Sequence, residues 1–321
     1  MKAGVASPDG VTIRDVPAPR PKPTEILVKV RGIGVNRADL AAALGDASHG
    51  STAGTPIGGE FAGEVVEVGA EVRDFRPGDR VMCHSAGSYA EYAVADYGRA
   101  VPIPPGLSFE QAATLPIGLN TLHNALVTRG RLQPGESVLI QGASSGVGLI
   151  GLQIAKLEGA GLVIGSSTNE ARRGRLKEFG ADLAVDTRDP SWPKQVLEAT
   201  GGKGVDLIAD MVSGPTVNPA MEAMAIRGRI VNIGRLGGMT GDFDFDLHAR
   251  KRIEYIGVTF RTRTIDEVRE IVTAMRADLS NALNAGKIRL PIDATYPLAE
   301  AAAAHERMRT NQHFGKLLLI P

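Results

Sequence analysis

The sequence contains little cysteine, no excess of charge and no long apolar run, and each of these absences excludes a class of protein. Cys83 is its only cysteine, which excludes an intramolecular disulfide and a cysteine-rich structural zinc site. Lys and Arg together number 36, as do Asp and Glu, so the formal net charge is zero. Because there is no basic excess to attract phosphates, nucleic acid is not expected as a main partner.

The chain also lacks the hydrophobic segments that secretion and membrane insertion require. Lys2, Pro8, Asp9 and Arg14 interrupt the first residues, and no stretch of about eighteen apolar residues occurs anywhere. We therefore expect a protein that is neither secreted through a signal peptide nor membrane-spanning. Together with the single cysteine, this predicts a cytoplasmic location.

The length favours two domains, and the first hundred residues are typical of a small β-rich one. A chain of 321 residues is too long for one average hydrophobic core, and its 39 glycines indicate many tight turns. Between these turns the predicted strands are Glu25–Val30, Ala62–Val68, Arg80–Cys83 and Ala90–Val94. Such short strands favour a small barrel or sandwich, followed by a helix that begins near Ser108.

From Ser137 onward, apolar strands alternate regularly with helices, which predicts a parallel sheet covered on both faces. The predicted strands are Ser137–Gln141, Leu162–Ser166, Leu183–Asp186, Val205–Met211, Arg229–Gly234 and Ile253–Val258. Six strands in this alternation predict a doubly wound Rossmann sheet of the α/β class. Trp192, which lies between the third and fourth strands, is expected to anchor a surface turn.

The C-terminal segment returns to mixed elements, which predicts a discontinuous first domain. The expected elements are a helix at Asp266–Ala285, a strand at Ala294–Pro297, a helix at Ala299–Thr310 and a final strand at Lys316–Ile320. We expect the final strand to join the N-terminal domain. The predicted domains are therefore residues 1–122 with 262–321, and residues 123–261.

A turn of small residues follows the first strand of the predicted parallel sheet and precedes a helix at Leu149–Leu157. Strand, glycine-containing turn and helix form the context that a dinucleotide-binding fingerprint requires. Small residues let backbone N–H groups approach the pyrophosphate, and the helix N-terminus favours negative charge. The residues expected at the pyrophosphate are Ala143, Ser144, Ser145, Gly146, Val147 and Gly148. Two of them, Ala143 and Ser145, stand where the standard pattern has glycines.

The residues after the second strand favour NADPH over NADH. An NAD site usually has Asp or Glu at this strand end, where it binds the ribose 2′-hydroxyl. This chain has Gly165-Ser-Ser-Thr-Asn169 instead, followed by Arg172 and Arg173. Hydroxyl and guanidinium donors without a nearby carboxylate suit a 2′-phosphate, which makes NADPH the predicted cofactor. Arg173 and Arg175 are expected on a solvated helix face.

A short-chain dehydrogenase is excluded because the chain lacks the proton donor of that family. That family requires a Tyr with a Lys four residues later. None of the tyrosines meets this requirement, and they are Tyr89, Tyr92, Tyr97, Tyr255 and Tyr296.

A series of motifs runs in a fixed order through nearly the whole chain. The motifs are Gly34–Asp39, Gly58–Gly63, Pro77–Val81, Gly87–Tyr92, Gly142–Gly148, Phe179–Asp182, Gly228–Gly234 and His313–Lys316. In these motifs the chain resembles the quinone oxidoreductase, or zeta-crystallin-like, branch of the medium-chain dehydrogenase/reductase superfamily. The resemblance implies a GroES-like catalytic domain beside the Rossmann domain, and NADPH-dependent reduction of quinones or activated C=C bonds by direct hydride transfer.

The resemblance also implies a reaction without zinc. Zinc-dependent relatives have Cys, His and Cys ligands where this chain has Asn36, Gly59 and Ile117, and the lobe of closely spaced cysteines is absent. Glu60 remains, and a turn or domain-interface role is expected for it. Without a Lewis acid a simple ketone is hard to reduce, whereas quinones and α,β-unsaturated carbonyls delocalise the charge that hydride transfer leaves.

The resemblance further assigns roles to individual residues. Asn36 and Thr121 would lie beside the nicotinamide as the catalytic residues. The 2′-phosphate would be contacted by Ser167 and Arg172, and Ser166 would also belong to the cofactor site. The remaining cofactor contacts would come from Asp210, Val212, Ile233, Gly234, Arg235, Leu236, Phe260, Gly315 and Lys316.

Two histidines are candidates for a proton donor. Quinone-reducing relatives often have a Tyr about ten residues after the Asn-Arg-Ala-Asp segment, but Leu44–Gly50 contains none. This departure puts direct quinone reduction in doubt, and His49 would occupy the substrate entrance instead. His84 is the second candidate, although a histidine at a strand end is more often structural.

Two alternative functions and one assembly stay open. An enoyl thioester reductase would need a wider cleft with basic residues at its rim. A sensor or recruited binding protein would hold NADPH with little turnover. We also expect a homodimer formed through the last Rossmann strand, Ile253–Val258, because an open apolar edge is usually paired or covered.

Overall fold

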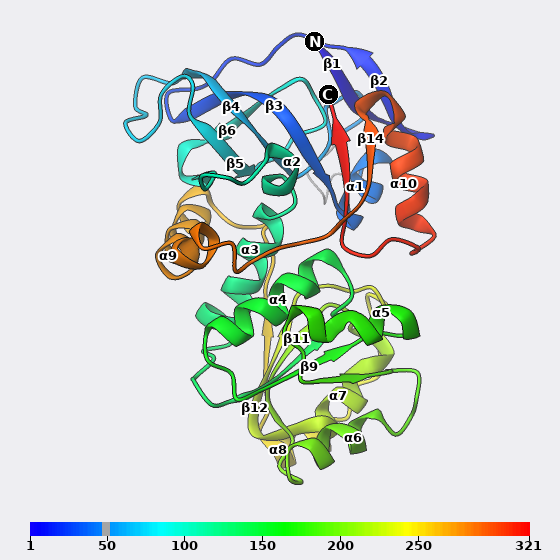
Figure 1. Cartoon of the computed structure of the whole chain (residues 1–321). Coiled ribbons are helices and arrows are strands. Elements are labelled where there is room, and N and C mark those ends of the chain that lie inside the picture. The colour runs from blue at the N-terminus through cyan, green and yellow to red at the C-terminus, as the bar shows by residue number, and fades with distance from the viewer. Residues whose placement is uncertain (47–51) are drawn as a thin grey trace. The chain divides into compact units, whose positions relative to one another are not determined.

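The computed structural model describes residues 1–46 and 52–321, which form two compact units (Figure 1). The first unit consists of Met1–Ile117 and Phe260–Pro321, and the second unit is the continuous segment Gly118–Thr259. His49, the candidate for the substrate entrance, lies outside the described residues. Within residues 1–46 and 52–321, no helix is long and apolar enough to cross a bilayer.

The second unit is built on the predicted six-stranded parallel sheet. Its strands are β8 (Ser137–Gln141), β9 (Leu162–Ser166), β10 (Leu183–Val185), β11 (Val205–Asp210), β12 (Met224–Asn232) and β13 (Glu254–Gly257). They are hydrogen-bonded in the order β10-β9-β8-β11-β12-β13, and every pair is parallel. This order confirms the doubly wound Rossmann fold. It reverses between β8 and β11, and open α/β sheets bind ligands outside the carboxyl ends of the strands at such a point.

Helices cover both faces of this sheet (Figure 1) because its central strands are apolar on both sides. The helices are α3 (Pro116–His123, which begins in the first unit), α4 (Gly146–Leu157), α5 (Glu170–Arg175), α6 (Trp192–Ala199), α7 (Val217–Ala223) and α8 (Phe245–Lys251). Leu139 of β8 belongs to a core cluster with residues of α6, α7 and α8. Its neighbour Ile140 points to the other face, where a Cβ added at Gly151 of α4 would lie 3.5 Å from it.

Trp192 corrects one expectation. It was expected to anchor a surface turn, but it is the first residue of α6, and its side chain is 2% exposed within the core of the second unit. The physical reason is Pro193, which the first turn of a helix accommodates because the N–H groups there have no partner inside the helix. The proline therefore lies within the start of a helix, and the indole turns inward.

The first unit contains a seven-stranded sheet that both ends of its sequence build. Its strands are β3 (Glu25–Val35), β4 (Glu60–Val68), β5 (Arg80–His84), β6 (Tyr92–Asp96), β7 (Ala100–Pro102), β14 (Ile292–Pro297) and β15 (Lys316–Ile320). The order is β14-β15-β3-β4-β5-β7, with β6 paired to β3. Because β15 runs antiparallel to β3, with Leu317 opposite Val35, the prediction that the final strand joins the N-terminal domain is confirmed.

A hairpin and four helices complete the first unit. The hairpin strands are β1 (Lys2–Ser7) and β2 (Gly10–Asp15), and the helices are α1 (Arg37–Ala43), α2 (Phe109–Ala112), α9 (Ile265–Asn284) and α10 (Ala301–Arg309). The sequence analysis did not predict the hairpin. Helix α9 is held to the sheet by Arg269, whose guanidinium donates to the Asp96 carboxylate over 2.7 Å and lies over the ring of Tyr97.

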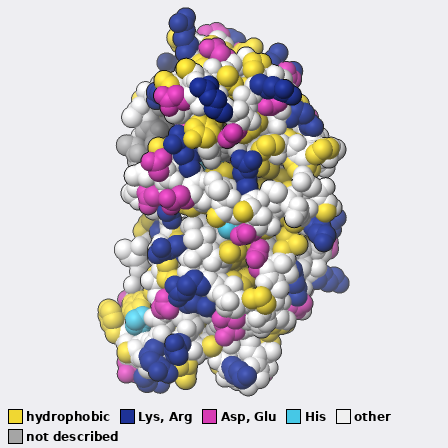
Figure 2. Space-filling model, turned by 90° about the vertical axis from the view of Figure 1, so that its left-hand side faces the viewer, with side chains coloured by type: hydrophobic (Ala, Val, Ile, Leu, Met, Phe, Trp, Pro, Cys, Tyr) yellow, Lys and Arg dark blue, Asp and Glu magenta, His cyan; other side chains and the backbone are white. Residues whose placement is uncertain are grey.

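Charged side chains of both signs share the surface. On the face drawn in Figure 2, Lys and Arg are interspersed with Asp and Glu. This mixture fits the zero formal net charge of the chain.

The buried indole of Trp192 gives a stability prediction. Replacing it in the Trp192→Ala variant removes the largest fully buried side chain of the second unit, and we expect the free energy of unfolding to fall by about 3–5 kcal/mol. Lys194→Ala in the same helix is the control, because that side chain is exposed and should change stability by no more than about 0.5 kcal/mol. Equal denaturation midpoints for the two variants would contradict the buried placement.

Candidate functional site

The turn after β8 has the geometry of a nucleotide-binding turn. Gly142 has a φ of +79°, a conformation that favours glycine. Ser145 caps α4, because its hydroxyl accepts the N–H of Gly148 over 3.1 Å and donates to the Gly142 carbonyl over 2.9 Å. Gly148 is required by packing, since a Cβ there would lie 2.6 Å from Cα of Ala143. Ser145 thus stabilises the helix start although it departs from the glycine pattern.

Hydroxyl groups join this turn to the end of β9. The N–H of Gly142 donates to Oγ of Ser166 over 3.0 Å, and Oγ of Ser167 donates to Oγ of Ser144 over 2.9 Å. Ser166 is 1% exposed, so its hydroxyl holds the turn from the buried side. These bonds place the predicted pyrophosphate and 2′-phosphate residues side by side.

The arginines of α5 differ in their surroundings. The N–H of Arg172 donates to Oδ1 of the capping residue Asn169 over 3.0 Å. Arg173 does not lie on the solvated face expected for it, because its guanidinium donates to the Ser167 carbonyl over 2.8 Å and to the Asp186 carboxylate over 3.1 Å. The reason is that α5 begins directly after β9, which brings its first turn against the strand ends. Arg175 is about half exposed and pairs with Glu178.

Asp210 organises the ends of β11 and β12. Its buried carboxylate accepts the N–H groups of Val212 over 2.8 Å and Ser213 over 3.0 Å. Burial raises the pKa of this carboxyl group, and these hydrogen bonds oppose the rise. Ser213 has a φ of +57°, an uncommon conformation for a non-glycine residue, and its hydroxyl donates to the Gly234 carbonyl over 2.8 Å. The loops that contain Val212 and Ile233–Leu236 are therefore tied together, while their contacts with a cofactor stay a prediction.

Asn36 lies at the centre of a polar cluster in the first unit. It follows β3 and precedes α1, and its backbone N–H donates to the Asp39 carboxylate over 2.8 Å. Its side-chain Nδ2 donates to Oε1 of Glu60 over 2.8 Å, and its Oδ1 accepts from Nζ of Lys316 over 2.6 Å. Lys316 and Glu60 also form an ion pair, in which the two residues are 4% and 0% exposed.

Glu60 was expected in a turn or at the domain interface, and the structure shows that it is not in a turn. It is the first residue of β4 and is fully buried, and its second oxygen accepts the N–H of Ile117 over 2.8 Å. Of the three positions that the resemblance assigned to zinc ligands in relatives, Asn36 and Ile117 both donate to this carboxylate, and Gly59 directly precedes it in the chain. In the described part of the chain, no group of three or more His, Cys, Asp or Glu side chains is arranged to hold a metal ion.

A second buried chain of polar groups, which the sequence did not predict, continues from Asp39. The hydroxyl of Tyr89 lies 3.1 Å from the Asp39 carboxylate and 3.1 Å from Nε2 of His305. Burial raises the pKa of Asp39 to about 7, and it lowers the pKa of His305 to about 4. Asp39 and Tyr89 belong to two of the quoted motifs, but no local pattern connects either with His305.

His84 has the surroundings of a structural residue. It ends β5, and its ring packs edge-on against Phe260 with 4.7 Å between centroids. Burial lowers the pKa of His84 to about 3, so the ring is neutral at physiological pH. A neutral imidazole with so low a pKa is a poor proton donor.

Gly315 places Lys316 in the cluster. Its φ is +92°, and a Cβ there would lie 2.2 Å from the Pro291 carbonyl oxygen. Only glycine fits this approach, after which β15 begins with Lys316. The ammonium of Lys316 has three N–H donors, of which the contacts with Asn36 and Glu60 occupy two. Its predicted contact with the cofactor stays a prediction.

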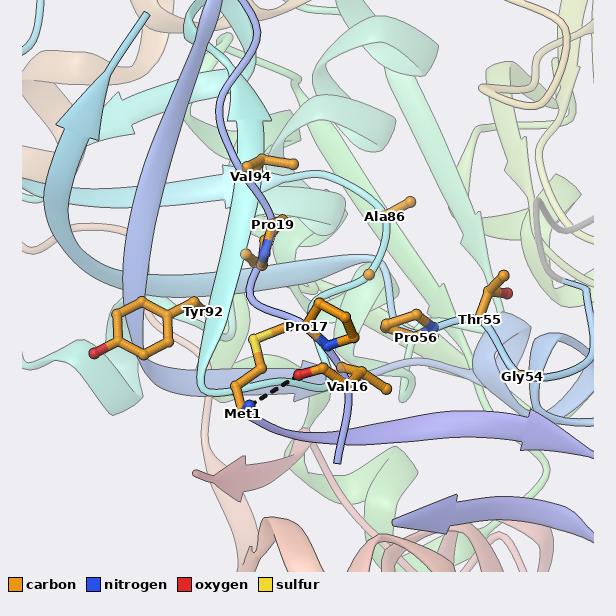
Figure 3. A pocket seen from close by; sticks show the side chains of 12 residues that line it. Met1, Val16, Pro17, Pro19, Gly54, Thr55, Pro56, Ala86, Tyr92 and Val94 are labelled. Carbon is orange, nitrogen blue, oxygen red and sulfur yellow. Dashed lines mark hydrogen bonds between the residues drawn. The ribbon is translucent and has the colours of Figure 1, made fainter. Parts of the chain in front are cut away.

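Two surface hollows of the first unit lie apart from these clusters. Figure 3 shows one of about 400 Å³, which is lined by Met1, Val16, Pro17, Pro19, Gly54, Thr55, Pro56, Ala86, Gly87, Tyr92, Ala93 and Val94. The second, of about 600 Å³, lies beside Tyr296 and Leu298. None of the predicted site residues lines either hollow, and neither lining contains a cluster of catalytic groups.

Comparisons with known proteins match both units. A family described as "Alcohol dehydrogenase GroES-like domain" matches residues 22–105, and one described as "Zinc-binding dehydrogenase" matches residues 146–277. The chain is 30% identical to the quinone oxidoreductase of Rattus norvegicus over 313 residues, which cover 95% of this chain and 92% of the rat protein.

A solved structure and a much larger relative extend the comparison. The structure of Escherichia coli quinone oxidoreductase complexed with NADPH superimposes with a TM-score of 0.88 at 27% identity, and covers 100% of this chain and 99% of the other. The chain is also 33% identical over 299 residues to erythronolide synthase EryA2 of Saccharopolyspora erythraea, a match that covers 92% of this chain and 8% of the synthase.

Asp39 gives a prediction about stability and pH. Because burial raises its pKa from 3.8 to about 7, its contribution to stability is fully present below pH 3.8 and is lost as the pH rises through 7. An Asp39→Asn variant has no ionisable group at this position, so it does not lose stability in this way. The free energy of unfolding of the variant, minus that of the wild type, should therefore rise between pH 5 and pH 8, by on the order of 2–3 kcal/mol. Denaturant titrations at several pH values measure it, and a constant difference would show that Asp39 is ionised throughout.

Proposed function

Because the chain belongs to the quinone oxidoreductase family of the medium-chain dehydrogenase/reductase superfamily, and is an oxidoreductase, we propose that it reduces quinones or conjugated enones with NADPH and without zinc. The observation that carries the cofactor assignment is the strand end at Ser166–Asn169. It bears hydroxyl and amide groups in place of a carboxylate, and Arg172 follows it. The NADPH complex of the Escherichia coli relative supports the same cofactor.

The second unit has the residues that such a cofactor needs. We propose that the turn Gly142–Gly148 and the N-terminus of α4 bind the pyrophosphate through backbone N–H groups. Ser167 and Arg172 would bind the 2′-phosphate, and the loops after β11 and β12 would contact the nicotinamide ribose. The nicotinamide, when bound, supplies the hydride.

Asn36 and Thr121 are the proposed catalytic residues. Hydride transfer needs no covalent bond to the protein, so the task of these side chains is to orient the reacting rings and to exclude water. Phe260, which packs against His84, would contribute an apolar surface to the same site.

The absence of a catalytic metal is part of the proposal. Asn36, Gly59 and Ile117 offer one amide, no side chain and one apolar side chain, which are poor zinc ligands. A substrate that delocalises its own negative charge therefore suits the site better than a simple ketone does.

An enoyl thioester reductase is the second candidate. The similarity to a segment of erythronolide synthase EryA2, which spans nearly the whole chain, favours it. The two candidates share the hydride chemistry and differ in the group that activates the double bond.

The decay of NADPH absorbance at 340 nm tests the proposal. NADPH and NADH are each assayed against quinones, enones and enoyl thioesters, with and without a chelator. Turnover of a quinone or enone that survives the chelator supports the proposal, whereas turnover of thioesters alone supports the second candidate. NADPH binding without any turnover would indicate a sensor or recruited binding protein.

Arg172 gives a prediction about cofactor choice. Arg172→Ala removes the proposed charge-assisted bond to the 2′-phosphate, so the Kd for NADPH should rise roughly 10- to 100-fold while that for NADH stays the same. Arg175→Ala is the matched control, because Arg175 pairs with Glu178 at the surface. Fluorescence titration measures both constants. An equal loss of affinity for NADH and NADPH would show that Arg172 does not contact the 2′-phosphate.

We also propose that the protein is cytoplasmic and forms homodimers through β13. This strand is the last in the sheet order, and Tyr255 on it is 37% exposed. Open edges of this kind are usually paired or covered. The single cysteine, Cys83, is buried and unpaired, which fits a reducing compartment.

Light scattering tests the assembly. We expect a mass of twice the 33.7 kDa of the chain for the wild type. Ile256→Lys places a charge on the edge strand and should give the single-chain mass, whereas Val66→Lys on the solvent side of β4 should not. A wild-type mass near 33.7 kDa would overturn the assembly.

A further inference from the structure

The carboxamide of Asn36 is held between a group that only donates hydrogen bonds and a group that only accepts them. Lys316 offers ammonium protons and no lone pair, and ionised Glu60 offers lone pairs and no proton. Oδ1 of Asn36 accepts from Lys316, and Nδ2 donates to Glu60. If the amide were turned by 180°, its NH2 group would face the ammonium and its oxygen would face the carboxylate.

We infer that Glu60 and Lys316 are positioning residues that fix one of the two orientations of the Asn36 carboxamide. This inference rests on the proposed function, in which Asn36 contacts the reacting rings. Nδ2 also lies 3.3 Å from the Gly34 carbonyl, so both of its protons face inward. The group left for a ligand is the second lone pair of Oδ1, which makes Asn36 an acceptor toward cofactor or substrate.

Burial strengthens the case that this ion pair serves the site. Glu60 is 0% exposed and Lys316 is 4% exposed, and removing two charges from water costs several kcal/mol that their attraction only partly returns. An apolar pair would fill the same space without this cost. The charges do, however, distinguish the oxygen of an amide from its nitrogen, which an apolar pair cannot do.

The surrounding backbone fixes both partners independently of Asn36. The second oxygen of Glu60 accepts the N–H of Ile117 over 2.8 Å, and the close approach of Gly315 to Pro291 places Lys316. The backbone of Asn36 is held in turn by Asp39 over 2.8 Å. The amide plane is therefore the remaining degree of freedom, and the ion pair removes it.

Steady-state kinetics of four variants separate positioning from a purely structural role. Glu60→Gln removes the group that only accepts hydrogen bonds, and Lys316→Met removes the group that only donates them. A misplaced reacting group typically costs about 100-fold in rate. We expect kcat to fall by roughly 10- to 100-fold in both variants. For Glu60→Gln, which has no proposed contact with the cofactor, the KM for NADPH should stay within about threefold of the wild-type value. Lys316→Arg keeps a donor-only cation and should recover most of kcat. Lys251→Met is the control and should leave kcat unchanged, because Lys251 donates to the carbonyls of Glu222 and Met224 in the second unit.

Two outcomes would overturn the inference. One is a kcat for Glu60→Gln equal to that of the wild type. The other is a kcat for Lys316→Arg as low as that for Lys316→Met although thermal unfolding shows a folded protein.

A spectroscopic readout keeps the orientation testable apart from turnover. The side-chain amide of Asn36, identified by ¹⁵N-asparagine labelling and its loss in Asn36→Ser, should show one proton shifted downfield by the carboxylate. This shift should vanish in Glu60→Gln and persist in Lys251→Met. Its absence from the wild type would overturn the inference, whereas a wild type that shows the shift but turns over no substrate would refute the proposed function alone.

Discussion

In the first unit, the buried carboxylate of Glu60 is the charged group that several segments of the chain must compensate. Its two oxygens receive hydrogen bonds from Asn36 and Ile117 and the charge of Lys316, so four separate segments of the chain meet at one side chain. A carboxylate without water must be compensated, and the fold has to bring all of these donors together. The antiparallel pairing of β15 with β3 and the glycine at position 315 meet that requirement, because they bring Lys316 to the carboxylate.

The second unit depends on a different constraint, which is the common direction of its strands. Parallel strands end at one edge of the sheet, so the loops after β8, β9, β11 and β12 are neighbours although they are far apart in the sequence. Side chains then join these loops, as Ser167 joins Ser144 and Ser213 joins Gly234. The turn Gly142–Gly148 and the loops beside it are thereby held in place by hydrogen bonds within the second unit.

Local sequence patterns predicted the strands correctly where one short segment determines the structure by itself. The bounds of β8, β9 and β15 match those predicted from the sequence, because each is an apolar run flanked by turn residues. Trp192 was misplaced because prolines on either side of it are typical of a turn, although a helix also tolerates proline in its first turn. The hairpin β1–β2 was missed because β1 consists mostly of small residues (Lys2-Ala-Gly-Val-Ala-Ser7), which give no apolar alternation although the strand is buried.

Contacts over long sequence distances were beyond local patterns. Tyr89 and His305 are 216 residues apart, and Asn36 and Lys316 are 280 apart. Nothing near either residue in the sequence indicates its partner, since only the paired strands bring them together. The family resemblance indicated Asn36 and Lys316 as site residues, but it indicated neither their hydrogen bond nor the chain through Asp39.

The discontinuity of the first unit also sets an order of events during synthesis. The second unit is continuous, and its contacts are completed once residue 259 has left the ribosome. Glu60 has by then already been synthesised, whereas its counter-ion Lys316 follows later. The N-terminal strands must therefore stay open, or hold this carboxyl group in contact with water, until β15 is made. The cation of this cluster is therefore made after Asn36, Glu60 and Ile117, and the cluster can close only when β15 has formed.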